Sequence, residues 1–151
     1  MKLTKRGEYG LRALLTLACV YGQRTLSLRE ISVQEKLPVK FLEQIMMILK
    51  RNNFVESIKG KHGGYSLSRP PAEITVGEIV RVVDGPLAPI GTAREIEKKI
   101  QKDEHNAGLY SILLDVRNAI SDILDRKSLA DVCKKSLELA RQKPERQMYY
   151  I

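Results

Sequence analysis

The stretch from Leu37 to Arg51 carries the pattern that most limits how this chain can fold. Proline disfavours a helical conformation at the preceding residue, here Leu37, and is itself well suited to begin a helix, so Pro38 marks a break followed by a helix start. Beyond this break, apolar residues recur at helical spacing along one face: Leu42, Ile45, Met46 and Leu49. The other face carries Lys40, Glu43, Gln44, Met47 and Arg51. Such a helix anchors in a core on one side and presents side chains to a partner on the other.

A second short helix is predicted just before this one. Ser27-Leu28-Arg29-Glu30 is a capping box, in which the serine hydroxyl accepts a hydrogen bond from the third helical amide and the glutamate accepts one from the serine amide. The predicted helix ends near Lys36. It buries Leu28 and Ile31, and Val33 is a further candidate. Two short helices joined by a tight break, the second with a polar outer face, form the helix-turn-helix pattern, whose second helix recognises DNA.

A basic β-hairpin is predicted directly after these helices. Phe54–Ile58 is typical of one strand and Tyr65–Ser68 of its return. Between them lies Lys59-Gly60-Lys61-His62-Gly63-Gly64, where three glycines permit the positive φ of a tight turn. A helix-turn-helix followed by such a hairpin is a winged helix. The tip has no large apolar side chain, so it can approach a sugar-phosphate backbone or a minor groove closely.

Two further helices complete the predicted N-terminal unit. Thr4 is expected to cap a first helix that begins at Lys5 or Glu8 and runs to Tyr21. A second capping box, Thr75 with Glu78, opens a helix that Gly85-Pro86 stops after Asp84. The apolar run near the N-terminus is interrupted by Glu8 and Arg12, which argues against a signal peptide, and no segment is long enough to span a membrane.

Charge divides the chain into two unequal halves. Residues 1–70 contain 13 Lys and Arg against 5 Asp and Glu, a net charge of +8, whereas residues 71–151 contain 13 of each. A basic module beside a neutral one suggests a polyanion-binding part joined to an assembly or sensing part. The two cysteines, Cys19 and Cys133, form no disulfide framework and no CxxC pair, which favours a reducing cytoplasm. Each lies on an apolar helix face, where an inert buried thiol is expected.

The C-terminal half is expected to mediate dimerisation. Leu87–Gly108 indicates a mobile connection with a short helix at Ala93–Gln101, and a long amphipathic helix follows from Leu109 to Arg126. Its apolar residues form a continuous seam with spacing near 3.5 residues: Leu109, Ile112, Leu113, Val116, Ile120, Ile123 and Leu124. The alternative is a core helix of the same domain, but the basic half already has a three-helix core of its own. Ser128 then caps a last helix that ends at Arg141.

The predicted fold is therefore mainly α with a small β-hairpin wing. It consists of a winged helix-turn-helix DNA-binding domain over residues 1–85, a connecting or sensor loop over 86–108, a dimerisation helix and a C-terminal helix over 109–141, and a tail over 142–151.

Four segments together carry a family resemblance: Lys2-Leu3-Thr4-Lys5-Arg6-Gly7-Glu8-Tyr9-Gly10, Leu42-Glu43-Gln44, Gly60-Lys61-His62-Gly63-Gly64-Tyr65 and Asp84-Gly85-Pro86-Leu87-Ala88-Pro89. With them the chain resembles the Rrf-type (IscR/NsrR/CymR-like) family of bacterial winged-helix transcriptional regulators, from Met1 to about Leu129. The resemblance implies a homodimer with long crossed helices, bound to a palindromic operator and usually acting as a repressor.

The same resemblance implies residue roles. It places Lys40, Glu43 and Gln44 at base edges in the major groove, where Gln44 can pair with adenine and Glu43 can accept a hydrogen bond from cytosine. The alternative for Glu43 is an ion pair with Lys40 or Lys50. Six basic side chains suit phosphates: Lys2, Lys5, Arg6, Lys50, Arg51 and Lys61. The wing is expected to approach DNA through Lys59, Gly60, His62 and Gly63, with His62 alternatively a solvated loop residue.

The chain also departs from the family pattern. Cluster-binding relatives carry three cysteines in the segment that corresponds to Leu87–Gly108, and this segment contains none, so the ordinary iron–sulfur ligands are missing. An atypical cluster that uses Glu8, His105 or Cys133 is the alternative. We therefore expect no cofactor, and a signal that arrives through a partner such as an enzyme of cysteine synthesis or through a small molecule at the dimer interface.

Two other classes of function are the alternatives to a DNA-binding regulator. A protein-interaction module that regulates an enzyme would use the winged helix as a scaffold and would bind DNA only non-specifically. An enzyme is disfavoured because the sequence shows no clustered His, Cys, Asp and Glu, and because no helix follows the glycine-rich turn as a phosphate cradle requires.

Overall fold

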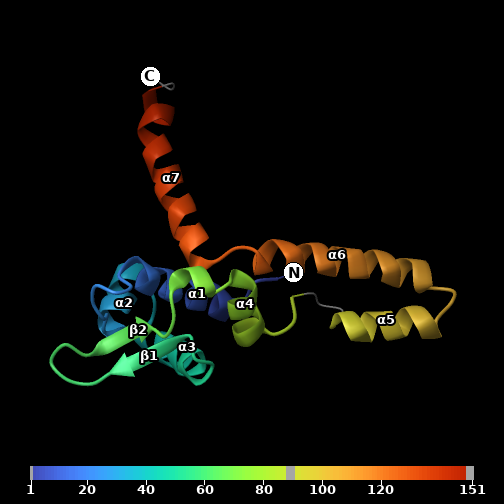
Figure 1. The fold of residues 1–151 in the computed structure, drawn as a ribbon, viewed down its shortest axis with the longest axis horizontal. Helices are drawn as coiled ribbons and strands as arrows, with labels where there is room; N and C mark the ends of the chain where they lie inside the picture. Colours follow the sequence, from blue (N-terminus) through green and yellow to red (C-terminus); the bar gives the residue numbers. More distant parts are fainter. Residues whose placement is uncertain (1, 88–90, 149–151) are drawn as a thin grey trace.

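The computed structural model describes residues 2–87 and 91–148. Its elements, in chain order, are α1 (Lys5–Cys19), α2 (Leu28–Glu35), α3 (Val39–Arg51), β1 (Val55–Ile58), β2 (Gly64–Leu67), the 3-10 turn η1 (Pro71–Glu73), α4 (Val76–Asp84), α5 (Ala93–Lys102), α6 (Ala107–Asp125) and α7 (Leu129–Met148). Figure 1 shows α1–α4 and the hairpin gathered into one cluster, from which α5 and α6 extend together as an arm and α7 projects in another direction.

The predicted helix starts in the cluster are confirmed. The Thr4 hydroxyl accepts a hydrogen bond from the amide of Gly7, and both capping boxes are complete, Ser27 with Glu30 and Thr75 with Glu78. In each box the serine or threonine satisfies an amide that the first turn of a helix would leave unpaired. Helix α1 ends at Cys19, two residues before the predicted end.

The cluster packs around one hydrophobic core. The recurring apolar residues of α1, α3 and α4 meet there, and the most deeply buried members are Ala13, Leu14, Ile31, Leu42, Ile45, Met46, Leu49, Ile74, Ile79 and Leu129, each 0% exposed. The prediction that Val33 is a buried candidate is wrong, because its side chain is 71% exposed. Val33 follows Ile31 by two residues, and at 3.6 residues per turn that places it on the opposite side of α2.

The wing forms as predicted and is attached to the rest of the cluster. Strands β1 and β2 are antiparallel, with Val55 opposite Leu67 and Ile58 opposite Gly64. Leu26 exchanges two backbone hydrogen bonds with Tyr65, at 3.0 and 2.7 Å, so the segment between α1 and α2 lies beside β2 like a third strand. Gly60 and Gly64 have φ of 114° and 147°, which favour glycine. The fold is thus a winged helix-turn-helix.

The arm is more regular than the mobile connection that the sequence predicts for its first part. The short helix expected at Ala93–Gln101 is confirmed as α5, which runs alongside α6 (Figure 1). Thr92 and Glu95 form a third capping box that the sequence reasoning overlooked. Ile96, 1% exposed, is the buried residue of α5. Residues 88–90 of the expected connection lie outside the described residues.

Helix α7 begins in the core and then leaves it. Ser128 caps it as predicted, because its hydroxyl accepts a hydrogen bond from the Asp131 amide at 3.1 Å and its own amide donates to the Asp131 carboxylate at 2.9 Å. Leu129 is buried in the cluster. The predicted end at Arg141 is wrong, because α7 continues to Met148. Pro144 removes one backbone hydrogen bond, but the residues around it are mostly Glu, Arg and Gln, which favour helix. Across residues 2–87 and 91–148, no helix has the length and apolar character needed to cross a membrane.

Candidate nucleic-acid interface

Helix α3 divides its side chains between the core and the surface. Leu42, Ile45, Met46 and Leu49 are buried. The three predicted base-reading residues, Lys40, Glu43 and Gln44, are all exposed, and Met47 on the same side is 49% exposed. Residues at i, i+3 and i+4 lie within about one turn of a helix, so the structure brings the three together on one exposed strip.

The alternative role for Glu43, an ion pair with a neighbouring lysine, is not observed. Among the described residues, no ion pair within 4.0 Å includes Glu43. Lys50 instead donates a hydrogen bond from Nζ to the Ser57 hydroxyl, at 2.7 Å, and so connects the end of α3 to β1. Arg51 is exposed next to it. The Glu43 carboxylate is therefore unengaged by cationic side chains within this part of the chain and faces solvent.

The start of α1 brings basic residues beside the start of α3. The rings of Tyr9 and Phe41 pack edge to face, with centroids 5.5 Å apart, and the Lys5 Nζ lies 5.9 Å from the Tyr9 ring centroid. Lys2, Lys5 and Arg6 are all exposed there. The amide of Thr4 donates to the Asp84 carboxylate at 3.0 Å, which ties this end of α1 to α4.

The wing carries the remaining predicted DNA contacts. Lys59, Gly60, Lys61 and His62 are exposed and Gly63 is half-buried. A residue that the sequence reasoning missed, Thr25, holds this loop: its hydroxyl lies 2.9 Å from the carbonyl oxygen of His62 and 3.2 Å from that of Gly63. No local pattern could have revealed this contact, since 37 residues separate Thr25 from His62. The wing loop is thus fastened near its tip as well as at its base.

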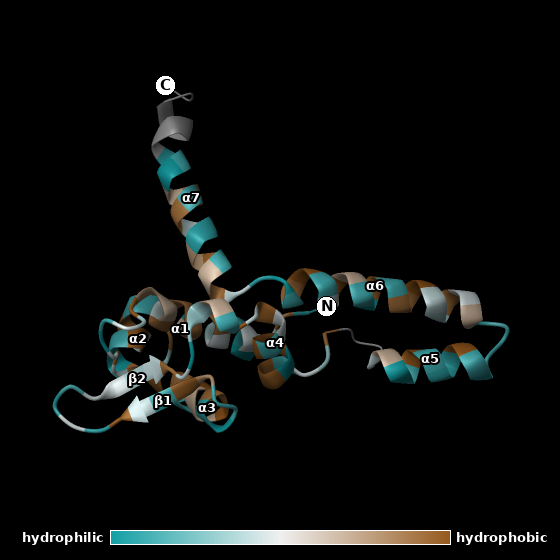
Figure 2. Ribbon diagram, in the orientation of Figure 1, coloured by the Kyte–Doolittle hydropathy of each residue, from teal (hydrophilic) through white to brown (hydrophobic). Residues whose placement is uncertain are grey.

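The predicted dimerisation seam lies along α6. None of the 19 residues of this helix, all of which the structure describes, is buried. Of the seven seam residues, Leu109, Ile112, Val116 and Ile123 are between 51% and 63% exposed, whereas Leu113, Ile120 and Leu124 are half-buried. The exposed members, together with Ala119, follow each other at intervals of three and four residues, the spacing of a helix–helix seam. Figure 2 shows hydrophobic residues recurring along the length of α6.

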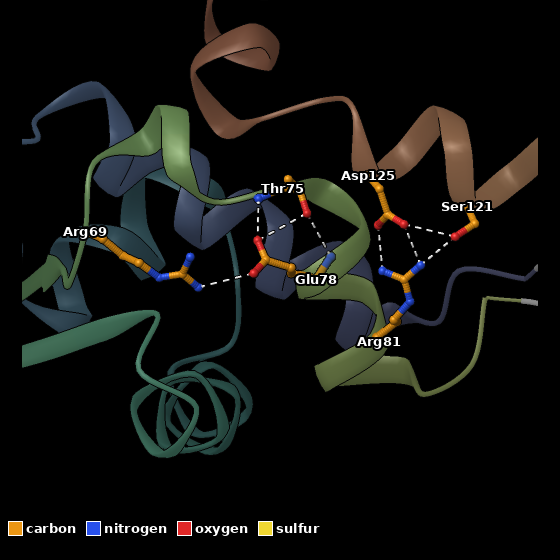
Figure 3. A network of polar contacts seen from close by, with 6 residues as sticks. All are labelled: Arg69, Thr75, Glu78, Arg81, Ser121 and Asp125. Carbon is orange, nitrogen blue, oxygen red and sulfur yellow. Dashed lines mark hydrogen bonds and ion pairs between the residues drawn. The ribbon is translucent and has the colours of Figure 1, made fainter. Parts of the chain in front are cut away.

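A polar network that the sequence did not indicate joins the arm to the cluster (Figure 3). Arg81 on α4 donates two hydrogen bonds to the Asp125 carboxylate, at 2.6 and 2.8 Å, and a third to the Ser121 hydroxyl at 2.7 Å. The hydrogen bonds from Arg81 lower the pKa of Asp125. Gly77 permits this approach, because a Cβ there would overlap the Asp125 carboxylate. In the first turn of the same helix, Glu78 pairs with Arg69 at 3.6 Å.

The weak metal-ligand candidates do not form a site within one chain. Glu8 pairs with Arg12 at 3.5 Å, and Cys133 lies beside Cys19, whereas His105 is in the turn between α5 and α6, at the far end of the arm (Figure 1). Within residues 2–87 and 91–148, no three His, Cys, Asp or Glu side chains converge. Within the part of the chain that the structure describes, these side chains therefore do not form a set of iron–sulfur ligands.

Both cysteines were expected to be buried, and this prediction is wrong. Cys19 is exposed and Cys133 is half-buried, with Sγ atoms 3.9 Å apart. Cys19 is the last residue of α1, where the helix reaches the edge of the cluster, and the start of α7 crosses it there.

The chain is similar in sequence to known transcriptional regulators. The sequence profile of the Rrf2 family, described as iron-dependent transcriptional regulators, matches residues 3–135. The chain is 33% identical to the HTH-type transcriptional regulator CymR of Bacillus subtilis over 132 residues, which cover 87% of this chain and 89% of the relative. It is 38% identical to the HTH-type transcriptional regulator IscR of Cereibacter sphaeroides over 86 residues, 56% of each protein.

Solved structures resemble this fold over most of its length. The structure of CymR (YrzC), the global cysteine regulator of B. subtilis, superposes with a TM-score of 0.76 at 32% identity and covers 89% of this chain and 98% of that one. The structure of T. potens IscR gives a TM-score of 0.70 at 31% identity and covers 90% of this chain and 88% of the other. In both cases the structural similarity extends beyond the winged helix into the arm.

Proposed function

The chain belongs to the Rrf2 family of DNA-binding transcriptional regulators and is not an enzyme, and from this premise we propose that it is a homodimeric repressor that reads a palindromic operator. The observation that carries the proposal is the exposed strip of Lys40, Glu43 and Gln44 on a helix whose other side is buried, beside a fastened basic wing. A rigid helix with an exposed polar strip can enter the major groove and hold its side chains at base edges.

Each of the three side chains has a distinct partner in this proposal. The Gln44 amide donates to and accepts from adenine, the Glu43 carboxylate accepts from the amino group of cytosine, and Lys40 donates to guanine. Glu43 has a second effect, because its negative charge repels base edges that present only acceptors. The backbone contacts come from the basic residues of α1, the end of α3 and the wing: Lys2, Lys5, Arg6, Lys50, Arg51, Lys59 and Lys61, with His62 and the glycines Gly60 and Gly63 lying close to the phosphates.

A second copy of the chain covers the seam on α6. Pairing of the exposed stripe with the same stripe of a partner removes Ile112, Val116 and Ile123 from water, which is favourable in proportion to the apolar area buried. A two-fold axis between two such helices relates the two α3 helices as well, and a symmetric dimer recognises inverted half-sites.

The signal in this proposal does not pass through an iron–sulfur cluster, because the ligands within one protomer do not converge. B. subtilis CymR is named as a global cysteine regulator, and we propose cysteine metabolism as the regulated process here as well. The regulating partner is then an enzyme of cysteine synthesis or a small molecule at the dimer interface. Protein purified without oxygen is expected to be colourless, and stoichiometric iron with visible absorption would contradict this part of the proposal.

The experiment that tests base reading compares two substitutions on the same operator duplexes. Glu43→Ala removes a base contact, so we expect it to relax the preference at one base pair of each half-site, by about 1–3 kcal/mol of discrimination. Lys61→Ala removes a phosphate contact, so we expect equal weakening on all sequences and a salt slope shallower by about one. Fluorescence anisotropy against a set of single-base operator variants measures both effects.

Matched controls are available on α7. Glu138 and Lys135 are exposed and lie away from α3 and the wing, so Glu138→Ala and Lys135→Ala change the net charge by the same amounts without touching the proposed interface. If Glu43→Ala and Lys61→Ala bind every duplex as these controls do, the assignment of roles is wrong.

A further inference from the structure

The two cysteines of the chain lie together although 114 residues separate them. The Sγ atoms of Cys19, at the end of α1, and Cys133, in the first turns of α7, are 3.9 Å apart. The two helices are held in this arrangement independently of the sulfurs. Leu129 at the start of α7 is buried in the core, its amide donates to the carbonyl oxygen of Ile74, and the Val76 amide donates to the carbonyl oxygen of Lys127 at the α6–α7 corner. The fold itself therefore keeps two thiols in contact.

The pair is accessible from solvent. Both thiols line a cavity of about 570 Å³ between α1, α2 and α7, whose walls also include Leu15, Thr16 and Leu137. Cys19 is exposed at this cavity, and Cys133 is half-buried behind it. A small oxidant can therefore reach the exposed sulfur first, and the second sulfur is already positioned to react with the product.

We propose that Cys19 and Cys133 form a dithiol modification site that peroxides convert into a disulfide within one chain. The Cys19 sulfur attacks one peroxide oxygen, the O–O bond breaks, and Cys19 becomes a sulfenic acid while one water leaves. The Cys133 sulfur then attacks the sulfenic sulfur, an S–S bond forms, the S–O bond breaks, and a second water leaves. Two thiols and one hydrogen peroxide thus give one disulfide and two waters.

The environment of Cys133 fits the second step of this sequence. Burial, and then the neighbouring Cys19 sulfur, raise the pKa of the Cys133 thiol to about 11, so Cys133 remains protonated and unreactive while Cys19 is a thiol. Oxidation of Cys19 to a neutral sulfenic acid removes the part of this rise that comes from the Cys19 sulfur, which favours the attacking thiolate form of Cys133, while the larger part that comes from burial remains. The sulfurs then need to approach by about 2 Å to reach the bond length of a disulfide.

The bond would fasten α7 to α1 and close a loop that includes most of the chain. Cross-linking residues this far apart restricts the unfolded chain strongly, and the oxidised protein is expected to have a Tm higher by on the order of 10 °C. The proposal concerns the fastening of α7 and does not rest on how the chain recognises DNA.

The test treats the full-length reduced protein with one equivalent of hydrogen peroxide and then measures its intact mass under denaturing conditions. We expect a loss of about 2 Da, the mass of two hydrogens, and a peptide map in which the segments around Cys19 and Cys133 are joined. Non-reducing electrophoresis is expected to show single chains, and a thermal scan is expected to show the rise in Tm, which a reductant reverses.

Two matched variants, Cys19→Ser and Cys133→Ser, each retain one thiol and are expected to show neither the 2 Da loss nor the Tm rise. The proposal is overturned if the wild-type protein keeps both thiols, gains oxygen at either sulfur without forming the internal bond, or cross-links between chains as readily as the variants do. Because the wild-type protein alone decides the outcome, a variant that fails to fold does not remove the test.

Discussion

The cluster of α1–α4 with the wing and the arm of α5 and α6 differ in how they bury their apolar residues. Four residues of α3 alone are buried, whereas α6, with 19 residues, buries none in a single chain. Ile112 and Ile123 on α6 are each 63% exposed. An exposed apolar stripe of this length is unusual on a protein surface unless another molecule covers it. The cluster is thus stabilised by its own core, whereas the arm exposes an apolar stripe that a second copy of the chain covers in the proposed dimer.

The largest expected effect comes from placing charge on the α6 stripe. Ile112→Asp combined with Val116→Asp would bury four carboxylates at the proposed dimer interface, and unpaired buried charge is costly. We expect dimer dissociation to become at least about 1000-fold more favourable, equivalent to about 4 kcal/mol, while the winged helix stays folded. Sedimentation velocity measures the first effect and circular dichroism the second.

The control places the same two charges elsewhere on α6. Ser111 and Asn118 are exposed and lie off the apolar stripe, so Ser111→Asp with Asn118→Asp should leave the dimer intact. If the dimer survives the first pair of substitutions as well as the second, α6 is not the dimer interface. The exposed apolar stripe would then not be explained by a second copy of the chain.

A smaller effect is expected within the cluster, at Thr25. Thr25→Val keeps the shape of the side chain but removes the hydroxyl that donates to the carbonyl oxygens of His62 and Gly63. Losing one such hydrogen bond costs about 1 kcal/mol, so the wing loop becomes less ordered and DNA affinity is expected to fall about five-fold on all sequences. Thr25→Ser retains the hydroxyl and should bind DNA like the wild type. If Thr25→Val and Thr25→Ser bind DNA with equal affinity, the hydrogen bonds of the Thr25 hydroxyl do not contribute to DNA binding.

The smallest effect is expected at the joint between the two regions. Arg81 lowers the pKa of Asp125, so this pair stabilises the folded state above the ordinary Asp pKa, and the contribution is lost as the pH falls through the lowered folded-state value. Both side chains are more than a third exposed, and we expect Arg81→Met to lower the free energy of unfolding by less than about 1 kcal/mol at pH 7. Urea unfolding of Arg81→Met, Asp125→Asn and the double variant at pH 7 and pH 3 measures the coupling. A coupling that is no weaker at pH 3 than at pH 7 would contradict this assignment.

Local features of the sequence predicted most of the cluster. Capping boxes, the break at Pro38 and the glycine-rich turn depend on residues a few positions apart, so their geometry is set by the neighbouring chain, and the structure confirms them. The exposed side of α3 followed from the same periodicity. The one-sided charge predicts that the N-terminal half carries the proposed DNA interface.

Contacts between distant segments could not be predicted in this way. The hydrogen bonds of Thr25 to the wing, the Arg81–Asp125 pair and the meeting of Cys19 with Cys133 join residues between 37 and 114 positions apart. Apolar periodicity placed both cysteines on packed faces, but it could not show that α1 ends at the edge of the cluster. The predicted end of α7 at Arg141 is also wrong, since the helix continues to Met148.

The most direct test of the proposed dimer is a selection of operator sequences by the wild-type protein from a pool of random duplexes. The account predicts that sequencing recovers two inverted half-sites whose centres lie a whole number of helical turns apart, about 10 bp each, because two α3 helices related by a two-fold axis enter successive major grooves. Recovery of a single unrepeated motif, or of no motif above the starting pool, would contradict the claim that paired α6 helices present two recognition helices to DNA.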